Sequence, residues 1–233
     1  MIKVFHGSDH VIKEPCYMGG KPDNDYGNGF YTTEYEDRAK SWAALNGNAE
    51  KSVVNCYEMD IDSLKILDLN NCGVLAWIAE VVANRGTNQE TANIVGERLV
   101  KRYRINSDGY DVIKGYRADD SYTQVVEAFL TNQINVFEVE RLFYKGALGN
   151  QLFLKSENAF LKIKWLEAYH VPHLEEYKTS DIQSRRTVGK FLSERMRAIL
   201  VDGYQVPGIT ARYALQVQLT YDKENGGYQN ASI

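Results

Sequence analysis

The chain has 233 residues, of which 44% are hydrophobic and 25% charged, which is typical of one large globular domain or of one domain with an appendage. The formal net charge of -4 argues against a protein whose main task is to coat nucleic acid. No apolar stretch approaches the roughly 20 residues that cross a bilayer, so no membrane association is expected.

Cysteine usage and the first residues indicate the compartment. Cys16, Cys56 and Cys72 are irregularly spaced, which argues against structural disulfides and against a zinc site. The N-terminal sequence MIKVFHGSDH lacks the apolar core of a secretory signal. We therefore expect a cytoplasmic protein without a bound metal.

Two short strands and a long loop are predicted at the start of the chain. Ile2–Phe5 predicts a strand that ends at His6-Gly7-Ser8, and Gly29–Thr33 predicts a second strand. The residues between them, about Lys13–Asn28, are dense in Gly, Pro, Asn and Asp, which favours a loop. A loop of this length inside a domain is usually functional or mobile.

A helix is predicted directly after the second strand. Thr33 followed by Glu36 matches the capping-box pattern, which predicts a helix over about Glu34–Leu45 with Thr33 as its N-cap. Ala39, Trp42 and Ala43 then share one face of that helix.

The rest of the chain predicts an α+β fold. Strands alternate with helices without regular βαβ order, which argues against a doubly wound sheet. From about residue 171 the sequence predicts a helical C-terminal appendage, so the expected domains are 1–170 and 171–233. The further predicted strands are 52–59, 64–69, 110–116, 151–155 and one from 163 onward, and the further helices are 74–83, 91–103, 121–132, 135–143, 175–203 and 209–221.

Three segments are informative when taken together. The first is His6-Gly7-Ser8, the second is the Gly27-Asn28-Gly29-Phe30-Tyr31 junction with Trp42 eleven residues after Tyr31, and the third is a late strand that begins at Gln151. Their order and spacing resemble the ADP-ribosyltransferase superfamily in its poly(ADP-ribose) polymerase-like branch, over about 2–169 with a poorly matched middle. The chain is also similar to an uncharacterised bacterial family of this fold whose late strand begins with Gln.

The resemblance implies split antiparallel β-sheets with surrounding helices, and NAD as substrate. It implies that nicotinamide is released while one ADP-ribose unit passes to a macromolecular acceptor, protein or nucleic acid, as in bacterial toxins, defence factors or regulators. The residues it marks as catalytic are His6, Tyr31 and Gln151, and those it marks for NAD binding are His6, Gly7, Ser8, Gly29, Tyr31 and Trp42.

The chemistry of NAD cleavage explains these residue types. Two aromatic faces, Tyr31 and Trp42, would sandwich the nicotinamide ring. Gly7 would let the backbone approach the carboxamide closely. His6 would bind a ribose hydroxyl and Ser8 the adenosine side, while the Lys13–Asn28 loop would lie over the dinucleotide as a lid.

Gln151 departs from the Glu that usually begins the late strand. An amide can bind the ribose 2′-hydroxyl but carries no charge, which by analogy with losing one preorganised group costs about 2.7–4 kcal/mol in the barrier. This argues against polymer elongation and leaves slow single transfer, a charge from another group, or binding alone. Asp119 and Asp120 are the candidate substitute carboxylates, although a helix N-terminus equally favours an acidic pair.

Several alternatives stay open. Taken singly, His6, Tyr31 and Trp42 are more typical of structural or packing residues, and only their joint order favours a site. Transfer to water would make the protein an NAD glycohydrolase, and loss of catalysis would leave an NAD or ADP-ribose-binding module. Transfer of an RNA 2′-phosphate needs converging arginines, which the motif segments lack. A plain interaction domain is the remaining alternative.

Overall fold

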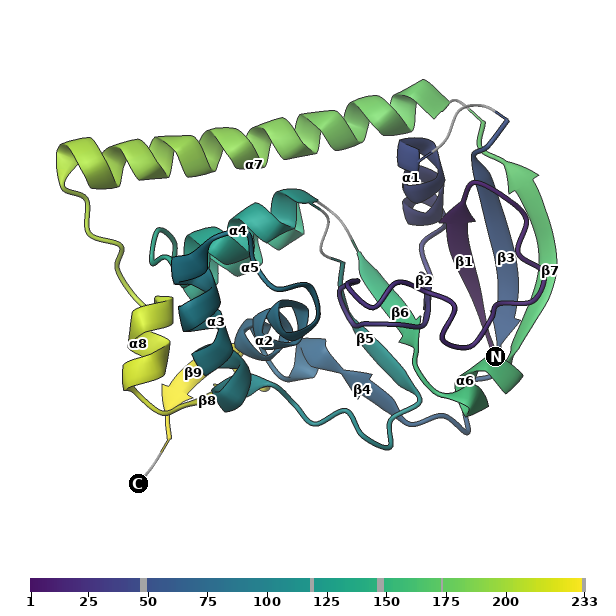
Figure 1. The fold of residues 1–233 in the computed structure, drawn as a ribbon, viewed down its shortest axis with the longest axis horizontal. Coiled ribbons are helices and arrows are strands. Elements are labelled where there is room, and N and C mark those ends of the chain that lie inside the picture. The colour runs from purple at the N-terminus through teal and green to yellow at the C-terminus, as the bar shows by residue number, and fades with distance from the viewer. Residues whose placement is uncertain (47–49, 118–119, 146–148, 173, 232–233) are drawn as a thin grey trace. The chain divides into compact units, whose positions relative to one another are not determined.

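The computed structural model describes residues 1–46, 50–117, 120–145, 149–172 and 174–231, which form an α+β protein with small antiparallel and mixed sheets (Figure 1). Its contacts divide the chain into two units, each built from separate stretches. The first unit holds Met1–Leu67, Ser107–Arg117 and Leu148–Ser184, and the second holds Asp68–Asn106, Ala118–Ala147 and Arg185–Ile233.

A three-stranded sheet forms one part of the first unit. Its strands are β1 (Ile2–Ser8), β3 (Val53–Met59) and β7 (Ile163–His170), in the order β1-β3-β7 with antiparallel neighbours. The central strand β3 is buried at every position except Glu58, as its run of β-branched and aromatic residues predicts. The predicted strand from residue 163 is also confirmed.

A second sheet lies beside the first. Its strands are β2 (Phe30–Thr32), β6 (Asn150–Leu154), β5 (Val112–Tyr116) and β4 (Ile66–Asp68), in the order β2-β6-β5-β4, and β6 runs antiparallel to both β2 and β5. Phe5 of β1 and Thr33 after β2 exchange two backbone hydrogen bonds of 2.8 and 2.9 Å. This bridge fixes β1 against β2, and the short helix α6 (Glu157–Leu161) follows β6.

Helix α1 (Glu36–Asn46) begins two residues later than predicted, and Thr33 is not its N-cap. Because the bridge to Phe5 keeps Thr33 extended, its hydroxyl instead donates to the carbonyl of Asn150 at 2.9 Å and accepts from the N–H of Tyr35 at 3.2 Å. The hydroxyl therefore joins β2 to β6 rather than starting the helix.

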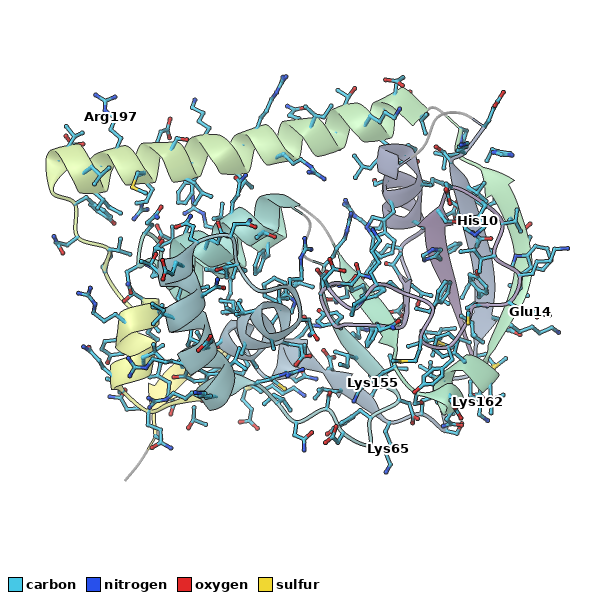
Figure 2. The ribbon with its side chains drawn as sticks, viewed as in Figure 1. His10, Glu14, Lys65, Lys155, Lys162 and Arg197 are labelled. Carbon is cyan, nitrogen blue, oxygen red and sulfur yellow. The ribbon has the colours of Figure 1, made fainter. Side chains whose placement is uncertain are left out.

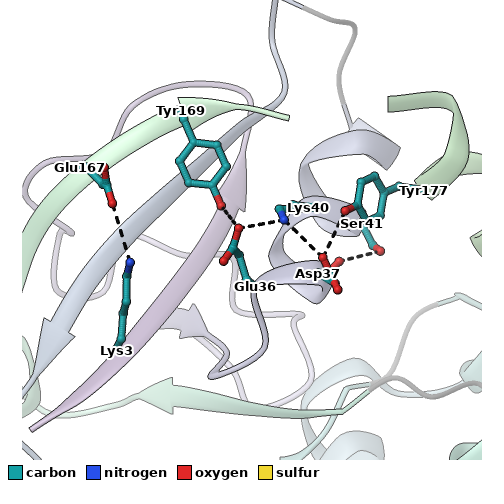
Figure 3. Close-up of polar contacts among 8 residues, drawn as sticks. All are labelled: Lys3, Glu36, Asp37, Lys40, Ser41, Glu167, Tyr169 and Tyr177. Carbon is teal, nitrogen blue, oxygen red and sulfur yellow. Dashed lines mark hydrogen bonds and ion pairs between the residues drawn. The ribbon is translucent and has the colours of Figure 1, made fainter. Parts of the chain in front are cut away.

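Acidic residues in the first turn of α1 bind β7 and the start of α7 (Leu174–Asp202) (Figure 3). The Tyr169 hydroxyl donates to Glu36 Oε1 at 2.6 Å, and Lys40 pairs with the same oxygen at 2.8 Å. These hydrogen bonds, first that from Lys40 and then that from Tyr169, hold the pKa of Glu36 below its ordinary value. The Tyr177 hydroxyl binds Asp37 at 3.1 Å. Residues from three parts of the sequence thus meet at one helix end.

The second unit consists mainly of helices. They are α2 (Val74–Arg85), α3 (Glu90–Tyr103), α4 (Asp120–Leu130), α5 (Val136–Lys145), α8 (Ala211–Gln216) and a 3-10 turn at Leu69–Asn71. Helix α2 is buried from Val74 to Val82, including Glu80, whose carboxylate pairs with both the Nε and a terminal nitrogen of Arg104 at 2.9 and 3.0 Å. Along the described part of the chain, no helix combines the length and apolarity needed to span a membrane.

The C-terminal stretch is not purely helical. Helix α7 confirms the prediction for 175–203, but the predicted helix over 209–221 is wrong beyond Gln216. Instead, β8 (Leu219–Asp222) and β9 (Gly227–Asn230) form a hairpin. The reason is a tertiary contact, because the Tyr228 hydroxyl accepts a hydrogen bond from the N–H of Leu75 at 2.7 Å. Leu75 lies in the first turn of α2, whose N-cap Gly73 offers no side chain.

Candidate functional site

His6 is held by the main chain of a neighbouring strand. Its Nδ1 atom lies 2.7 Å from the carbonyl oxygen of Tyr31, and its ring packs on Phe30 with a centroid distance of 4.5 Å. A carbonyl oxygen can only accept, so Nδ1 carries the proton and Nε2 presents a lone pair. Burial lowers the pKa of His6 to about 4, an effect that the Tyr31 carbonyl opposes and His10 reinforces. The imidazole is therefore neutral at pH 7 and offers one acceptor.

Tyr31 lies under the loop that precedes β2. Its hydroxyl donates to the carbonyl of Gly27 at 2.7 Å and accepts from the N–H of Tyr26 at 3.0 Å. Its ring runs nearly parallel to that of Tyr26, at 14° with centroids 6.4 Å apart, and contacts Phe153 at 4.8 Å. Residues 26 and 27 are thus fastened over the Tyr31 ring.

Tyr31 and Gln151 lie on the same face of the second sheet. Tyr31 of β2 pairs directly with Phe153 of β6, and antiparallel partners share a face. Gln151 lies two residues before Phe153 on the same strand, so its side chain leaves from that face as well. Its partner on β5 is Gly115, which has no side chain to crowd it.

Gln151 is buried beside a carboxylate that the sequence did not single out. Only 2% of Gln151 and 5% of Asp25 are exposed, and the amide nitrogen of Gln151 donates to Asp25 Oδ2 at 2.8 Å. The same nitrogen donates to the carbonyl of Tyr116 at 3.3 Å. The Tyr26 hydroxyl donates to that carbonyl at 2.6 Å. The loop therefore contributes a buried carboxyl group to the candidate site.

Trp42 is buried on the sheet side of α1, at 8% exposure. The guanidinium of Arg117 lies over its ring, 4.8 Å from the centroid. The Tyr31 ring contacts the rings of Tyr26 and Phe153. Trp42 thus presents its ring to a cation, which is a favourable arrangement for an indole face.

The two glycines of the predicted site allow close packing. A side chain at Gly7 would place its first carbon 2.0 Å from the carbonyl oxygen of Ala39, so the absent side chain lets α1 lie against β1. At Gly29 the same carbon would come within 2.4 Å of the Leu154 carbonyl oxygen and of the Phe153 ring. Both positions therefore require glycine for packing, whatever else they bind.

Ser8 is engaged with the chain that follows it. Its hydroxyl donates to the carbonyl of His10 at 2.6 Å and accepts from the amide of Asn55 at 3.0 Å. Asn55 also accepts from the N–H of Ile12 at 2.7 Å. Figure 2 labels His10 beside this end of β1. These hydrogen bonds hold the residues that follow β1 at the start of the loop.

Of the two predicted carboxylates after β5, Asp119 lies outside the described residues, and Asp120 begins α4 with its side chain likewise outside them. Asp25 had no recognisable signal, because a loop rich in glycine and acidic residues has no periodicity that marks one of them as buried.

The first unit thus links His6 to the main chain of Tyr31, the Tyr31 hydroxyl to the loop before β2, and Asp25 of that loop to Gln151. Residues 2–165 match a family described as a protein of unknown function, DUF3990. The chain belongs to the DUF3990 family. No curated protein and no solved structure matches the chain.

The DUF3990 match contains every candidate site residue and ends within β7. Chemically, the candidate site offers a neutral imidazole acceptor, stacked aromatic rings, and an amide held against a carboxyl group. Such a set can bind hydroxyl groups and a flat ring, and it places a buried carboxyl group at the amide.

Proposed function

We propose that this DUF3990 domain is an ADP-ribosyltransferase-like domain that binds NAD, transfers one ADP-ribose unit to a macromolecular acceptor and releases nicotinamide. The bond between ribose C1′ and the nicotinamide nitrogen breaks, and nicotinamide leaves with the electron pair. A nucleophilic atom of the acceptor forms the new bond to C1′ and loses its proton to water. His6, Tyr31 and Gln151 are the residues proposed to carry the reaction.

The single observation that carries this proposal is the hydrogen bond from His6 Nδ1 to the Tyr31 carbonyl. It fixes the tautomer in which Nε2 accepts, and burial keeps the ring neutral at pH 7. A neutral acceptor can bind the O–H of a ribose hydroxyl, whereas an imidazolium would repel the cation that develops at C1′.

Three further features support the proposal. The Tyr31 ring and the Gln151 side chain share one face of the second sheet, as ring binding beside ribose binding requires. The residues Asp25–Gly27 cover that face as a lid would. The resemblance of the His6-Gly7-Ser8, Tyr31–Trp42 and Gln151 pattern to the superfamily supplies the identity of the substrate.

The test is incubation of the purified protein with adenine-labelled NAD, with and without cell lysate, while released nicotinamide is measured. Label on protein or nucleic acid supports transfer, and label in free ADP-ribose supports hydrolysis by the same site. Tyr31→Ala is expected to abolish either one. The matched control is Tyr35→Ala, four residues later and 53% exposed, which should keep wild-type turnover.

Without nicotinamide release, the thermal stability of the protein with NAD decides the outcome. A rise in melting temperature that Tyr31→Ala removes would identify a binding module. If the protein shows no turnover and NAD causes no thermal shift, the proposal is refuted.

A further inference from the structure

We propose that Asp25 is a positioning residue that acts through Gln151 and supplies the negative charge that an amide lacks. The inference rests on the proposed function, because the charge is needed only if a cation develops at ribose C1′. It assigns to the loop before β2 a part in the chemistry, in addition to covering the site.

The hydrogen bonds of Gln151 fix which end of its amide faces a substrate. The nitrogen donates to Asp25 Oδ2 at 2.8 Å and to the Tyr116 carbonyl at 3.3 Å, so both of its protons are used. The reverse orientation would place the amide oxygen against two acceptors. Within the described part of the chain, the amide oxygen accepts no hydrogen bond. It is therefore the atom that a ribose hydroxyl would meet, as it would meet a carboxylate oxygen.

Burial of the Asp25–Gln151 pair strengthens the effect of the carboxylate on the amide. Gln151 is 2% and Asp25 5% exposed, so little water screens the interaction. A carboxylate that accepts from an amide N–H polarises the amide, which increases the negative charge on its oxygen. Asp25 and Gln151 together thus present to the ribose a more negative oxygen than glutamine alone would offer.

A purely structural role for Asp25 would be to fasten the loop. The loop has a second anchor close by, because the Tyr26 hydroxyl donates to the same Tyr116 carbonyl at 2.6 Å. Tyr26→Phe removes that anchor without changing any charge. It is therefore the matched control for the loss of loop attachment.

The experiment compares kcat and KM for nicotinamide release in four proteins. They are wild type, Asp25→Asn, Tyr26→Phe and the exchange variant Asp25→Asn/Gln151→Glu. Asparagine keeps the size of Asp25 and an oxygen that accepts from Gln151. Asp25→Asn should lower kcat at least about tenfold while KM changes less than about threefold, since the lost interaction acts in the transition state.

The exchange variant tests the charge directly, because it moves the carboxylate to residue 151 and the amide to residue 25. It should recover at least the wild-type kcat, and Tyr26→Phe should lose far less activity than Asp25→Asn. Melting temperatures of all four proteins show whether each one is folded.

Three results would overturn the inference while leaving the proposed function intact. They are an Asp25→Asn kcat equal to that of wild type, an exchange variant no more active than Asp25→Asn, or an equal loss in Tyr26→Phe. Absence of nicotinamide release from the wild type would instead refute the proposed function, and with it this inference.

Discussion

The Nδ1 atom of His6 donates to the backbone carbonyl of Tyr31, so the imidazole is oriented by the main chain rather than by the tyrosine side chain. Substitutions at residue 31 therefore change the ring and the hydroxyl while they leave the partner of His6 in place. The orientation of His6 and the properties of the Tyr31 side chain are separable by mutation.

The first prediction concerns pH. Burial lowers the pKa of His6 from 6.5 to about 4, so between these values the unfolded chain binds a proton that the folded chain does not. The contribution of His6 to stability should therefore fall as pH falls, by about 2 kcal/mol between pH 7.5 and pH 5. His6→Asn keeps a donor for the Tyr31 carbonyl but does not titrate. Urea unfolding of both proteins at the two pH values measures the difference, and identical pH dependence would contradict the pKa.

The second prediction concerns the Tyr31 hydroxyl. Tyr31→Phe removes its hydrogen bonds with Gly27 and Tyr26 and should destabilise the loop locally by about 1–2 kcal/mol. Hydrogen exchange of the Tyr26 amide should accelerate roughly tenfold, since about 1.4 kcal/mol corresponds to a factor of ten. Tyr35→Phe, at an exposed ring, is the control. Unchanged exchange in Tyr31→Phe would show that the loop is fastened by other contacts.

The third prediction concerns the contact between α1 and β1. Gly7→Ala would force a carbon to within 2.0 Å of the Ala39 carbonyl oxygen, so the helix must move. The expected loss of unfolding free energy is about 1–3 kcal/mol, as for other overpacked sites. Gly189→Ala, within α7 and with no atom within 4 Å of the added carbon, should instead stabilise by up to about 1 kcal/mol. Equal stability of wild type and Gly7→Ala in urea would contradict this packing.

The fourth prediction concerns the second unit. The Glu80 side chain is only 3% exposed, and that of Arg104 is 40% exposed. Arg104→Met leaves a buried carboxylate without its ion pair and should cost about 3 kcal/mol, the lower end for such pairs because water can approach. The double variant Glu80→Gln/Arg104→Met should regain part of this loss in thermal unfolding. A double variant less stable than the single one would show that the carboxylate is satisfied without Arg104.

The elements that could be predicted are those whose pattern is strong over several residues. The buried run at 52–59, the strand that carries Gln151, and the long helix α7 all appear close to their expected bounds. Their burial follows from local apolar content or helical periodicity, which the sequence displays directly. The α+β class followed from the same elements.

The remainder depends on contacts between distant residues. Helix α1 starts late because Phe5, far earlier in the chain, pairs with Thr33. Asp25 is buried because Gln151, more than a hundred residues away, donates to it. Neither relationship leaves a trace in the nearby sequence, so no local pattern marks Thr33 as extended or Asp25 as buried.

The hydroxyl that meets the first turn of α2 comes from residue 228, whereas the family match ends at residue 165. During synthesis on the ribosome, α2 emerges long before residue 228, so the N–H of Leu75 lacks this acceptor until the β8–β9 hairpin has formed. Acquisition of its native start by α2 therefore depends on a residue that lies 153 positions later in the chain.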